Sequence, residues 1–433
     1  QMCIRDRFMF QKFPIITNKS ANIVFFVLAG LIEFSVIWSL SDLPPELLNW
    51  RFKVNEILNL QIPSDNFYGP GGALLLLPFF WNSPNFNVAN FFYIGIGLYF
   101  YCKLTQKIEN LRYRFLAQMA LLINVYLFWL CVSSQDTVFE FALYMIFLFF
   151  ALNKKWGIAL TAAFLLAQTR AGYWGIFVIG IVILSIIEYK KYKKIEFRKL
   201  LIIPIFVISS LFNFINYNSF SPALEGGMTA YFSYAKNHYL SLPKFDMDVF
   251  LSGEKGDFQN PKLQYELLSA KNQAQVDKIY WKYALQSIKD NPKQTILGWM
   301  QKFESHLVTI QKVPNLPGRY VLNNESSTIN IENERLNWPL ILGNLVYEIY
   351  RFCLLFGGLL VAGMYFVLRK SSLNKVFESN NFNYIFIFWL PSIVSAIIFY
   401  SETRFKIVQE LSLLPLILFL YSKTRESMQK KSQ

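Results

Sequence analysis

Long apolar stretches separated by short polar connections recur from one end of the chain to the other. A transmembrane helix needs about 20 predominantly apolar residues, and it satisfies its backbone hydrogen bonds internally. The pattern therefore predicts an all-α polytopic membrane protein with about ten transmembrane helices, at residues 21–40, 88–104, 115–132, 137–152, 156–169, 172–188, 200–215, 347–368, 384–400 and 405–422.

The basic residues predict the orientation of these helices. Lys and Arg gather in every second connection, for example at Lys103 and Lys107 and in the strip KKYKKIEFRK at 190–199. Cytoplasmic connections of membrane proteins carry such an excess. We therefore expect a multi-pass membrane protein with both termini in the cytoplasm. The richness of the chain in Phe, Ile, Lys and Asn is typical of an AT-rich bacterial genome, so the expected location is a bacterial inner membrane. The formal charge of +14 is then explained by topology rather than by nucleic-acid binding.

Four parts follow from this pattern. The first seven residues, QMCIRDR, resemble a translated sequencing-adapter remnant and carry no argument about the fold. The predicted parts are a cytoplasmic N-terminus at 1–20, an N-terminal membrane domain of about seven spans at 21–215, a large outer-face loop at 216–346, and a segment of about three spans with a basic cytoplasmic tail at 347–433.

Two outer segments are long enough to hold structure of their own. The first outer loop, 41–87, contains YGPGGALLLLPFFW, which is too short to cross and is expected at the membrane interface or as a re-entrant turn. The second, 216–346, is expected to be mostly helical, because two stretches of helical periodicity straddle Asn291 and Pro292. Tyr280, Trp281 and Trp299 in these stretches suit helices on the membrane surface.

Candidate chemistry lies among polar residues on the predicted outer side. Asp136 and Glu140 are four residues apart and share a helix face, so they repel each other unless a base, a proton or a metal ion lies between them. A divalent cation held by these two acids is the one cofactor candidate. The scattered cysteines and the two histidines offer no other metal site, because they have no metal-ligand spacing. Structural explanations also exist: Asp136 suits a helix N-terminus, and Arg170 suits an interfacial anchor.

Four stretches together resemble the GT-C superfamily of membrane glycosyltransferases, especially protein O-mannosyltransferases and lipid A aminoarabinose transferases. They are IPSDNFYGPGGALLLLPFF after an acidic loop, SSQDTVFEFALYMIFLFFAL, NPKQTILGWMQKF, and SETRFKIVQELSLLPLILFL near the C-terminus. The resemblance implies an enzyme that moves a sugar from a polyprenyl-phosphate donor to a lipid, glycan or protein acceptor at the outer face.

The resemblance also implies roles for individual residues. Asp42 matches the catalytic acid of the first outer loop. In SDLPPELL, however, Leu-Pro-Pro separates Asp42 from Glu46, where the family usually has an adjacent Asp-Glu pair. Asp136 matches a second acidic position near the acceptor or a metal ion, and Arg404 matches an arginine near the donor phosphate. The other candidates are Glu46 as a substitute base, Glu402 and Arg170 near the phosphate, and Asp65, Tyr68 and Glu140 as substrate-binding residues.

Two other functions compete with this one. An O-antigen polymerase or ligase also has many spans and a large outer loop, and QTRAGYW is similar to the arginine-bearing start of a helix in those enzymes. Such an enzyme uses polyprenyl-diphosphate oligosaccharides. A transporter or lipid flippase is the non-enzymatic alternative, but that class often has internal repeats and charges at mid-membrane, whereas here the charges lie at the outer rim.

Overall fold

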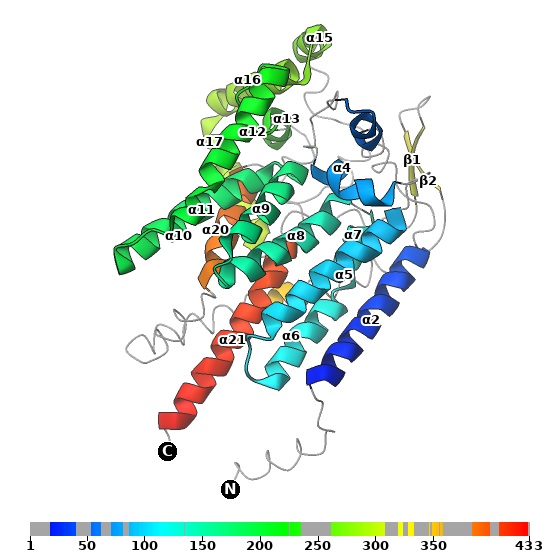
Figure 1. The fold of residues 1–433 in the computed structure, drawn as a ribbon. Helices are drawn as coiled ribbons and strands as arrows, with labels where there is room; N and C mark the ends of the chain where they lie inside the picture. Colours follow the sequence, from blue (N-terminus) through cyan, green and yellow to red (C-terminus); the bar gives the residue numbers. More distant parts are fainter. Residues whose placement is uncertain are drawn as a thin grey trace.

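The structure is a computed structural model in which a helical bundle carries a smaller group of helices at one end (Figure 1). It describes residues 18–39, 53–61, 71–80, 86–133, 135–224, 226–234, 261–307, 319–323, 328–332, 346, 349–354, 356–357, 383–398 and 407–431. The helices of the bundle are α2 (Asn18–Ser39), α5 (Phe86–Thr105), α6 (Leu111–Ile123), α7 (Val125–Ser133), α8 (Gln135–Leu152), α9 (Trp156–Thr169), α10 (Gly172–Tyr192), α11 (Phe197–Leu200), α12 (Ile202–Tyr217), α20 (Asn383–Ile398) and α21 (Ile407–Lys431).

Several of these helices suit a membrane. Within the described residues, three stretches are long and apolar enough to cross one, and a bent helix pair would make a fourth: Ser20–Ile37, Gly172–Lys190, Phe197–Tyr217, and the pair α6–α7. The prediction of a mainly helical protein is confirmed for the described residues, and these stretches are candidate membrane spans by their length and composition. The count of ten spans stays a prediction, and the predicted span 347–368 lies largely outside the described residues.

The centre of the bundle is α8, which lies between α5 and α9. Its apolar residues are buried around almost the whole helix. The ring of Phe147 lies 4.6 Å from that of Phe177 on α10 and 4.7 Å from that of Phe388 on α20, measured between centroids. Gly97 of α5 touches the ring of Phe141, so that the two helices approach closely. A helix wrapped in this way gives its polar first turn fixed surroundings.

The predicted span 115–132 is not one straight helix. The chain breaks between α6 and α7 with a bend of 49°. Asn124 lies at the break with φ −78° and ψ 68°, outside the helical region, and its backbone N–H donates to the carbonyl of Leu121. Asparagine has a lower helix propensity than the leucines and alanines around it, so a break is less costly here. The bend directs α7 toward the first turn of α8.

The apolar stretch of the first outer loop forms a short helix, α4 (Gly71–Leu76), followed by a 3-10 turn, η1 (Leu77–Phe79). It packs on the end of α9. A Cβ atom on Gly71 would lie 2.7 Å from the Cβ of Gln168 and 2.9 Å from the carbonyl oxygen of Leu165, so only glycine allows this approach. The expectation of a turn too short to cross fits this helix, and the bundle itself provides the surface on which it rests.

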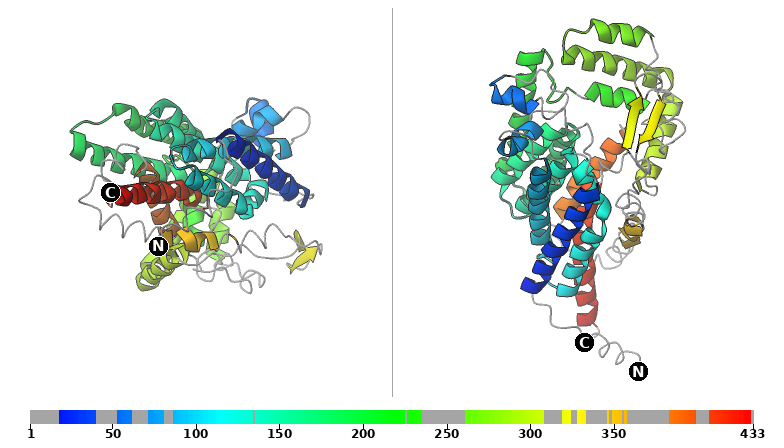
Figure 2. Two further views of the ribbon diagram at one scale, coloured as in Figure 1. Left: turned by 90° about the horizontal axis from the view of Figure 1, so that it is seen from below. Right: turned by 90° about the vertical axis from the view of Figure 1, so that its right-hand side faces the viewer.

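A second group of helices lies beyond one end of the bundle, and Figures 1 and 2 show it from different sides. This helical layer consists of α13 (Gly226–Tyr234), α15 (Pro261–Ser269), α16 (Gln273–Asp290) and α17 (Pro292–Leu307). The described residues of segment 216–346 are mostly helical, as expected. The segment also contains an antiparallel hairpin, β1 (Arg319–Asn323) and β2 (Thr328–Glu332), which the all-α prediction did not include. Both strands are rich in β-branched or aromatic residues, which favour strands.

The aromatic residues predicted for a membrane surface make contacts within this helical layer. Tyr280 is buried against Tyr231 of α13, and their ring centroids are 5.4 Å apart. The Trp299 indole N–H donates to the Tyr234 hydroxyl at 2.9 Å. Tyr234 in turn donates to the backbone carbonyl of Ile398, the last residue of α20. These contacts join the layer to the bundle.

Gly227 allows the close contact between α13 and α16. A Cβ atom at this position would lie 2.1 Å from the carbonyl oxygen of Asp277 and 2.8 Å from the Trp281 side chain. We expect Gly227→Ala to separate the two helices and to cost about 3 kcal/mol, as overpacking does. Hydrogen exchange should show a loss of protection in α13 and α16. Gly298→Ala on α17 is the matched control, because its Cβ would meet no atom within 4 Å; equal protection in both variants would contradict the prediction.

Asp277 should make the stability of the layer depend on pH. Burial raises its pKa from 3.8 to about 6, although the backbone N–H of Gly227, 2.6 Å away, lowers it in part. A carboxyl whose pKa is higher in the folded state stabilises the fold below its unfolded pKa, and this contribution is lost as pH rises through the folded pKa. Protection of α13, corrected for intrinsic exchange, should therefore fall between about pH 4 and pH 6, by about 2 to 3 kcal/mol.

Asp277→Asn should remove this dependence, since the amide oxygen still accepts from Gly227 and carries no charge. Asp290→Asn, at the exposed end of α16, serves as the control and should retain the wild-type pH profile. A wild-type profile in the Asp277 variant would assign the effect to another group.

Candidate functional site

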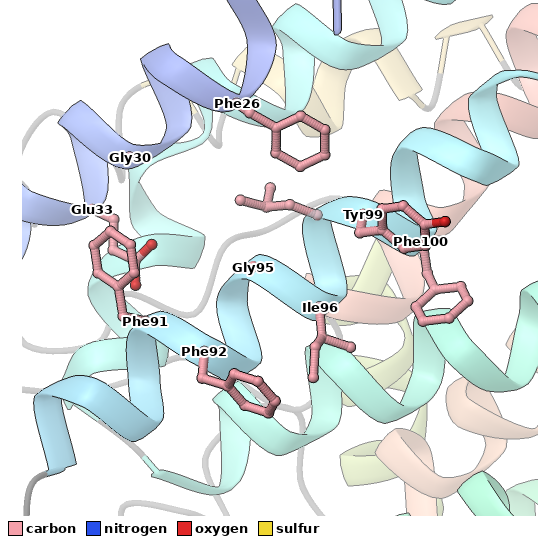
Figure 3. Close-up of a pocket in the computed structure, with 10 residues that line it drawn as sticks. Phe26, Gly30, Glu33, Phe91, Phe92, Gly95, Ile96, Tyr99 and Phe100 are labelled. Atoms are coloured by element: carbon pink, nitrogen blue, oxygen red, sulfur yellow. The ribbon is translucent and has the colours of Figure 1, made fainter. Parts of the chain in front are cut away.

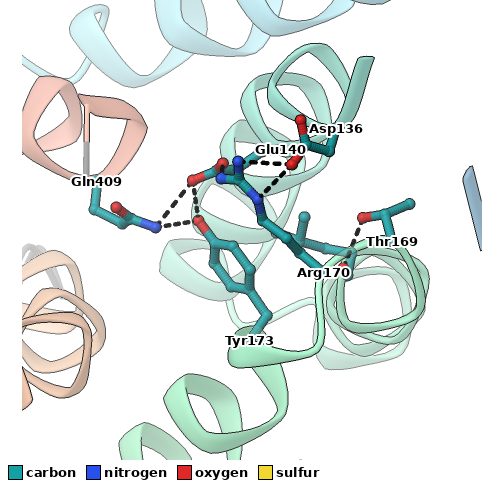
Figure 4. Close-up of polar contacts among 7 residues, drawn as sticks. Asp136, Glu140, Thr169, Arg170, Tyr173 and Gln409 are labelled. Atoms are coloured by element: carbon teal, nitrogen blue, oxygen red, sulfur yellow. Dashed lines mark hydrogen bonds and ion pairs between the residues drawn. The ribbon is translucent and has the colours of Figure 1, made fainter. Parts of the chain in front are cut away.

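Four helix ends meet where the bundle faces the helical layer. α8 begins at Gln135, α9 ends at Thr169, α10 begins at Gly172 and α21 begins at Ile407. Between α9 and α10 the chain turns over two residues. Arg170 has an extended backbone, with φ −143° and ψ 104°, and its N–H still donates to the carbonyl of Leu166. This tight turn directs the Arg170 side chain toward the first turn of α8 (Figure 4).

The guanidinium of Arg170 binds both carboxylates of that turn. Its Nε and Nη2 donate to one oxygen of Asp136, at 3.0 and 2.8 Å, and its Nη1 donates to Glu140. Arginine suits this arrangement because its donors lie in a fixed planar fork. The repulsion expected between Asp136 and Glu140 is thus relieved by a base. Arg170 occupies the position between the two acids, for which the spacing also allows a divalent cation. The described residues hold no group of three or more His, Cys, Asp or Glu that could bind a metal ion.

Two further side chains complete the cluster around Glu140. The Tyr173 hydroxyl, from the first turn of α10, donates to Glu140 Oε1 at 2.5 Å. The Gln409 amide, from the first turn of α21, donates to the same oxygen at 3.0 Å and also contacts the Tyr173 hydroxyl. We call Asp136, Glu140, Arg170, Tyr173 and Gln409 the arginine cluster. It links residues that are up to 273 positions apart, from 136 to 409.

Burial determines what each acid in the arginine cluster can do. The Glu140 side chain is fully buried and the Asp136 side chain is 15% exposed. Charge interactions are strong in such surroundings, so the network holds its members in fixed orientations. Two carboxylates and one guanidinium leave an excess of one negative charge when both acids are ionised. Asp136 is the member that reaches the surface, and it is therefore the acid that can meet a substrate.

The other predicted site residues lie outside the described part of the chain. They are Asp42, Glu46, Asp65 and Tyr68 in the first outer loop, and Glu402 and Arg404 between the last two predicted spans. Of the residues predicted for the site, the structure therefore brings together three: Asp136, Glu140 and Arg170. The expectation that Arg170 lies near a donor phosphate stays a prediction; in the structure its guanidinium is bound to these two acids.

We compared the chain with known proteins at the levels of family, sequence and structure. No family model, curated protein or solved structure matches it. The residues themselves therefore carry the functional argument.

Sequence reasoning missed Tyr173 and Gln409 as members of the cluster. Tyr173 belongs to the stretch QTRAGYW, which drew attention only through its arginine. Gln409 carried a signal of its own, because an amide beside Glu410 at the start of an apolar helix must find polar partners if it is buried. Glu410 also pairs with a residue distant in sequence, Arg351, at 3.1 Å.

A second polar cluster occurs near the opposite end of α10. The Lys199 amine pairs with Glu188 and lies 5.1 Å from the centre of the Trp156 ring, and the Tyr384 hydroxyl donates to Glu188 at 2.8 Å. Lys199 is fully buried although it belongs to the basic strip 190–199. It therefore contributes to packing among α9, α10, α11 and α20 as well as to the charge of the strip.

Proposed function

We propose that this protein is an integral membrane glycosyltransferase that moves a sugar from a polyprenyl-phosphate donor to a lipid, glycan or protein acceptor. The observation that carries the proposal is the arginine cluster, in which a partly exposed Asp136 is held by Arg170 where the bundle meets the helical layer. A fixed carboxylate at such a boundary suits contact with a polar acceptor that reaches a membrane-borne donor.

We place the helical layer, and with it Asp136, on the outer face of a bacterial inner membrane. The arrangement of the ends supports this choice. α2 begins and α21 ends at the end of the bundle opposite the layer (Figures 1 and 2). The basic connection between α5 and α6 lies at that same end, as cytoplasmic connections do. In this proposal the chain crosses the membrane about ten times, and both termini are cytoplasmic.

In the proposed reaction Asp42 is the general base. It takes the proton from an acceptor hydroxyl or amine, whose oxygen or nitrogen then attacks the anomeric carbon of the donor sugar. The bond between that carbon and the phosphate oxygen breaks, and polyprenyl phosphate leaves with the electron pair. Arg404 stabilises the leaving phosphate and Glu402 orients Arg404, while Glu46 lies near the base. Asp65, Tyr68 and Asp136 line the path of the substrates, and the buried Glu140 helps to hold Arg170 beside Asp136.

The test is a panel of radiolabelled polyprenyl-phosphate sugars, offered to the full-length protein in lipid nanodiscs. Transfer or slow hydrolysis of one sugar would support the proposal and identify its donor. If only polyprenyl-diphosphate oligosaccharides are bound and joined, the protein is a polymerase or ligase. Movement of an intact lipid or solute across the membrane without bond cleavage would assign it to the transporters.

Arg404 and Arg170 should differ in their effect on donor binding. Arg404→Ala removes the arginine proposed to meet phosphate and should raise the donor Kd by roughly tenfold or more, since a charge-assisted hydrogen bond contributes about 1.5 to 3 kcal/mol. Arg170→Ala should change donor affinity less, because Arg170 is bound to two carboxylates. Affinities for the donor in detergent provide the measurement, after each variant is shown to be folded. Equal effects of the two substitutions would remove the special role of Arg404.

A further inference from the structure

A groove lies between α2 and α5 on the side of the bundle (Figure 3). It has a volume of about 420 Å³, within the range of small-molecule sites. Its lining includes Phe26, Gly30 and Glu33 from α2 and Phe91, Gly95 and Tyr99 from α5. Phe91 and Tyr99 are almost half exposed, so the aromatic walls open sideways, as expected of a groove that faces lipid.

Two glycines leave open space in this groove. A Cβ atom added to Gly30 or to Gly95 would meet no atom within 4 Å. Gly97 on the same helix is different, because its Cβ would collide with the ring of Phe141. The glycines of the groove therefore do not serve close packing between helices, and the space above them is available to a ligand.

Among the residues that line this mostly apolar groove, one is a carboxylic acid. Glu33 is 2% exposed, and its Oε1 is buried without a hydrogen-bond partner in the described part of the chain. Glu33 lies six residues before the end of α2, or about 9 Å at the helical rise. A carboxylate ion without a cation costs much free energy in such surroundings. A pairing that needs no charge is therefore favoured, in which a neutral carboxyl meets a hydroxyl and each group donates one hydrogen bond.

We propose that the groove binds a single-chain lipid alcohol, with its hydroxyl on Glu33 and its apolar chain along Gly30 and Gly95. The volume of the groove and the open space at its two glycines suit one chain. A hydroxyl on the ligand would give the Glu33 carboxyl a hydrogen-bond partner, whereas a hydrocarbon chain alone would leave it unsatisfied. The groove is lined by α2 and α5 alone, and the arginine cluster contributes no residue to it. The proposal therefore does not rest on the transferase activity.

The experiment uses a photoreactive long-chain primary alcohol and its matched hydrocarbon, which lacks the hydroxyl. Each probe is added to the full-length protein in nanodiscs, irradiated, and located on peptides by mass spectrometry. The alcohol should label the peptides of α2 and α5 about tenfold more than the hydrocarbon does. One hydrogen bond to a buried acceptor changes a binding constant by about this factor. Equal labelling by the two probes would overturn the role of Glu33.

Variants separate the shape of the groove from its polar group. Gly95→Leu should fill the groove and lower labelling about tenfold or more. Gly175→Leu is its matched control on α10, since this glycine is exposed and its Cβ also meets nothing within 4 Å. The control should label like the wild type. Wild-type labelling in a folded Gly95→Leu variant would place the alcohol elsewhere.

Two substitutions at Glu33 test the neutral pairing. Glu33→Gln keeps one donor and one acceptor and should retain labelling within about threefold, whereas Glu33→Leu should lose about tenfold. If Glu33→Gln loses as much as Glu33→Leu, the ligand needs a charged carboxylate and the alcohol is the wrong class.

Discussion

Arg170→Leu should lower the free energy of unfolding by about 3 to 5 kcal/mol, as removal of one partner from a buried ion pair does. The substitution leaves Asp136 and Glu140 on one helix face without the guanidinium that binds them. Glu140 is fully buried, and it cannot recover this interaction from water. Denaturant titration in detergent, followed by far-ultraviolet circular dichroism, measures the change.

A matched control is the exposed pair Lys282–Glu266 in the helical layer, where the lysine side chain is 63% exposed. Lys282→Leu should leave the denaturation midpoint close to that of the wild type, because water screens an exposed pair. The double variant Arg170→Leu with Glu140→Gln should recover part of the loss, because it removes one of the two unpaired charges. A loss below about 1 kcal/mol in Arg170→Leu would mean that the cluster is not a buried charge network.

Asp42→Asn should abolish sugar transfer while leaving donor binding intact. A general base contributes about 10²- to 10⁴-fold to a rate, and asparagine cannot accept the proton. Transfer rate and donor affinity should be measured on the same preparation, with the donor that the panel identifies. Glu109→Gln is a suitable control, because Glu109 lies in the basic connection between α5 and α6 and pairs with Lys423.

Each result for Asp42→Asn has a definite meaning. Loss of turnover with normal donor affinity assigns the base to Asp42 and argues against a polymerase or ligase, which relies more on arginine and histidine. Near-normal turnover would refute Asp42, and Glu46→Gln would then be tested as the substitute base. Loss of donor affinity as well would move Asp42 from the acceptor side to the donor side of the site.

The sequence predicts most helices of the bundle but little of how they meet. The predicted span 156–169 coincides with α9, and the predicted span 172–188 begins with α10, because apolar runs and polar connections determine both. The bend at Asn124 is missed, since one asparagine in an apolar run does not fix whether a helix continues. The strands at 319–323 and 328–332 are missed because their pairing depends on contacts outside each short segment.

The candidate site shows the same limit. The spacing of Asp136 and Glu140 predicts that something must lie between them, and it allows a base, a proton or a metal ion. Arg170 is 34 and 30 residues away from these acids in sequence, and periodicity within one helix gives no information about such a partner. Gln409 is further still, and only the packing of α21 against α8 brings it to Glu140.

During synthesis, α4 leaves the ribosome well before the surface that receives it exists. Gly71 rests against Leu165 and Gln168 of α9, and the chain from Gly71 to Leu165 takes roughly 5 to 20 s to make at about 5–20 residues per second. In the proposed topology, only the flanking helices determine on which side of the membrane the first outer loop lies during that interval. Its position over the bundle is fixed only after α9 is in place, so an insertion defect in α9 would misplace the loop that carries Asp42 even though the loop's own sequence is intact.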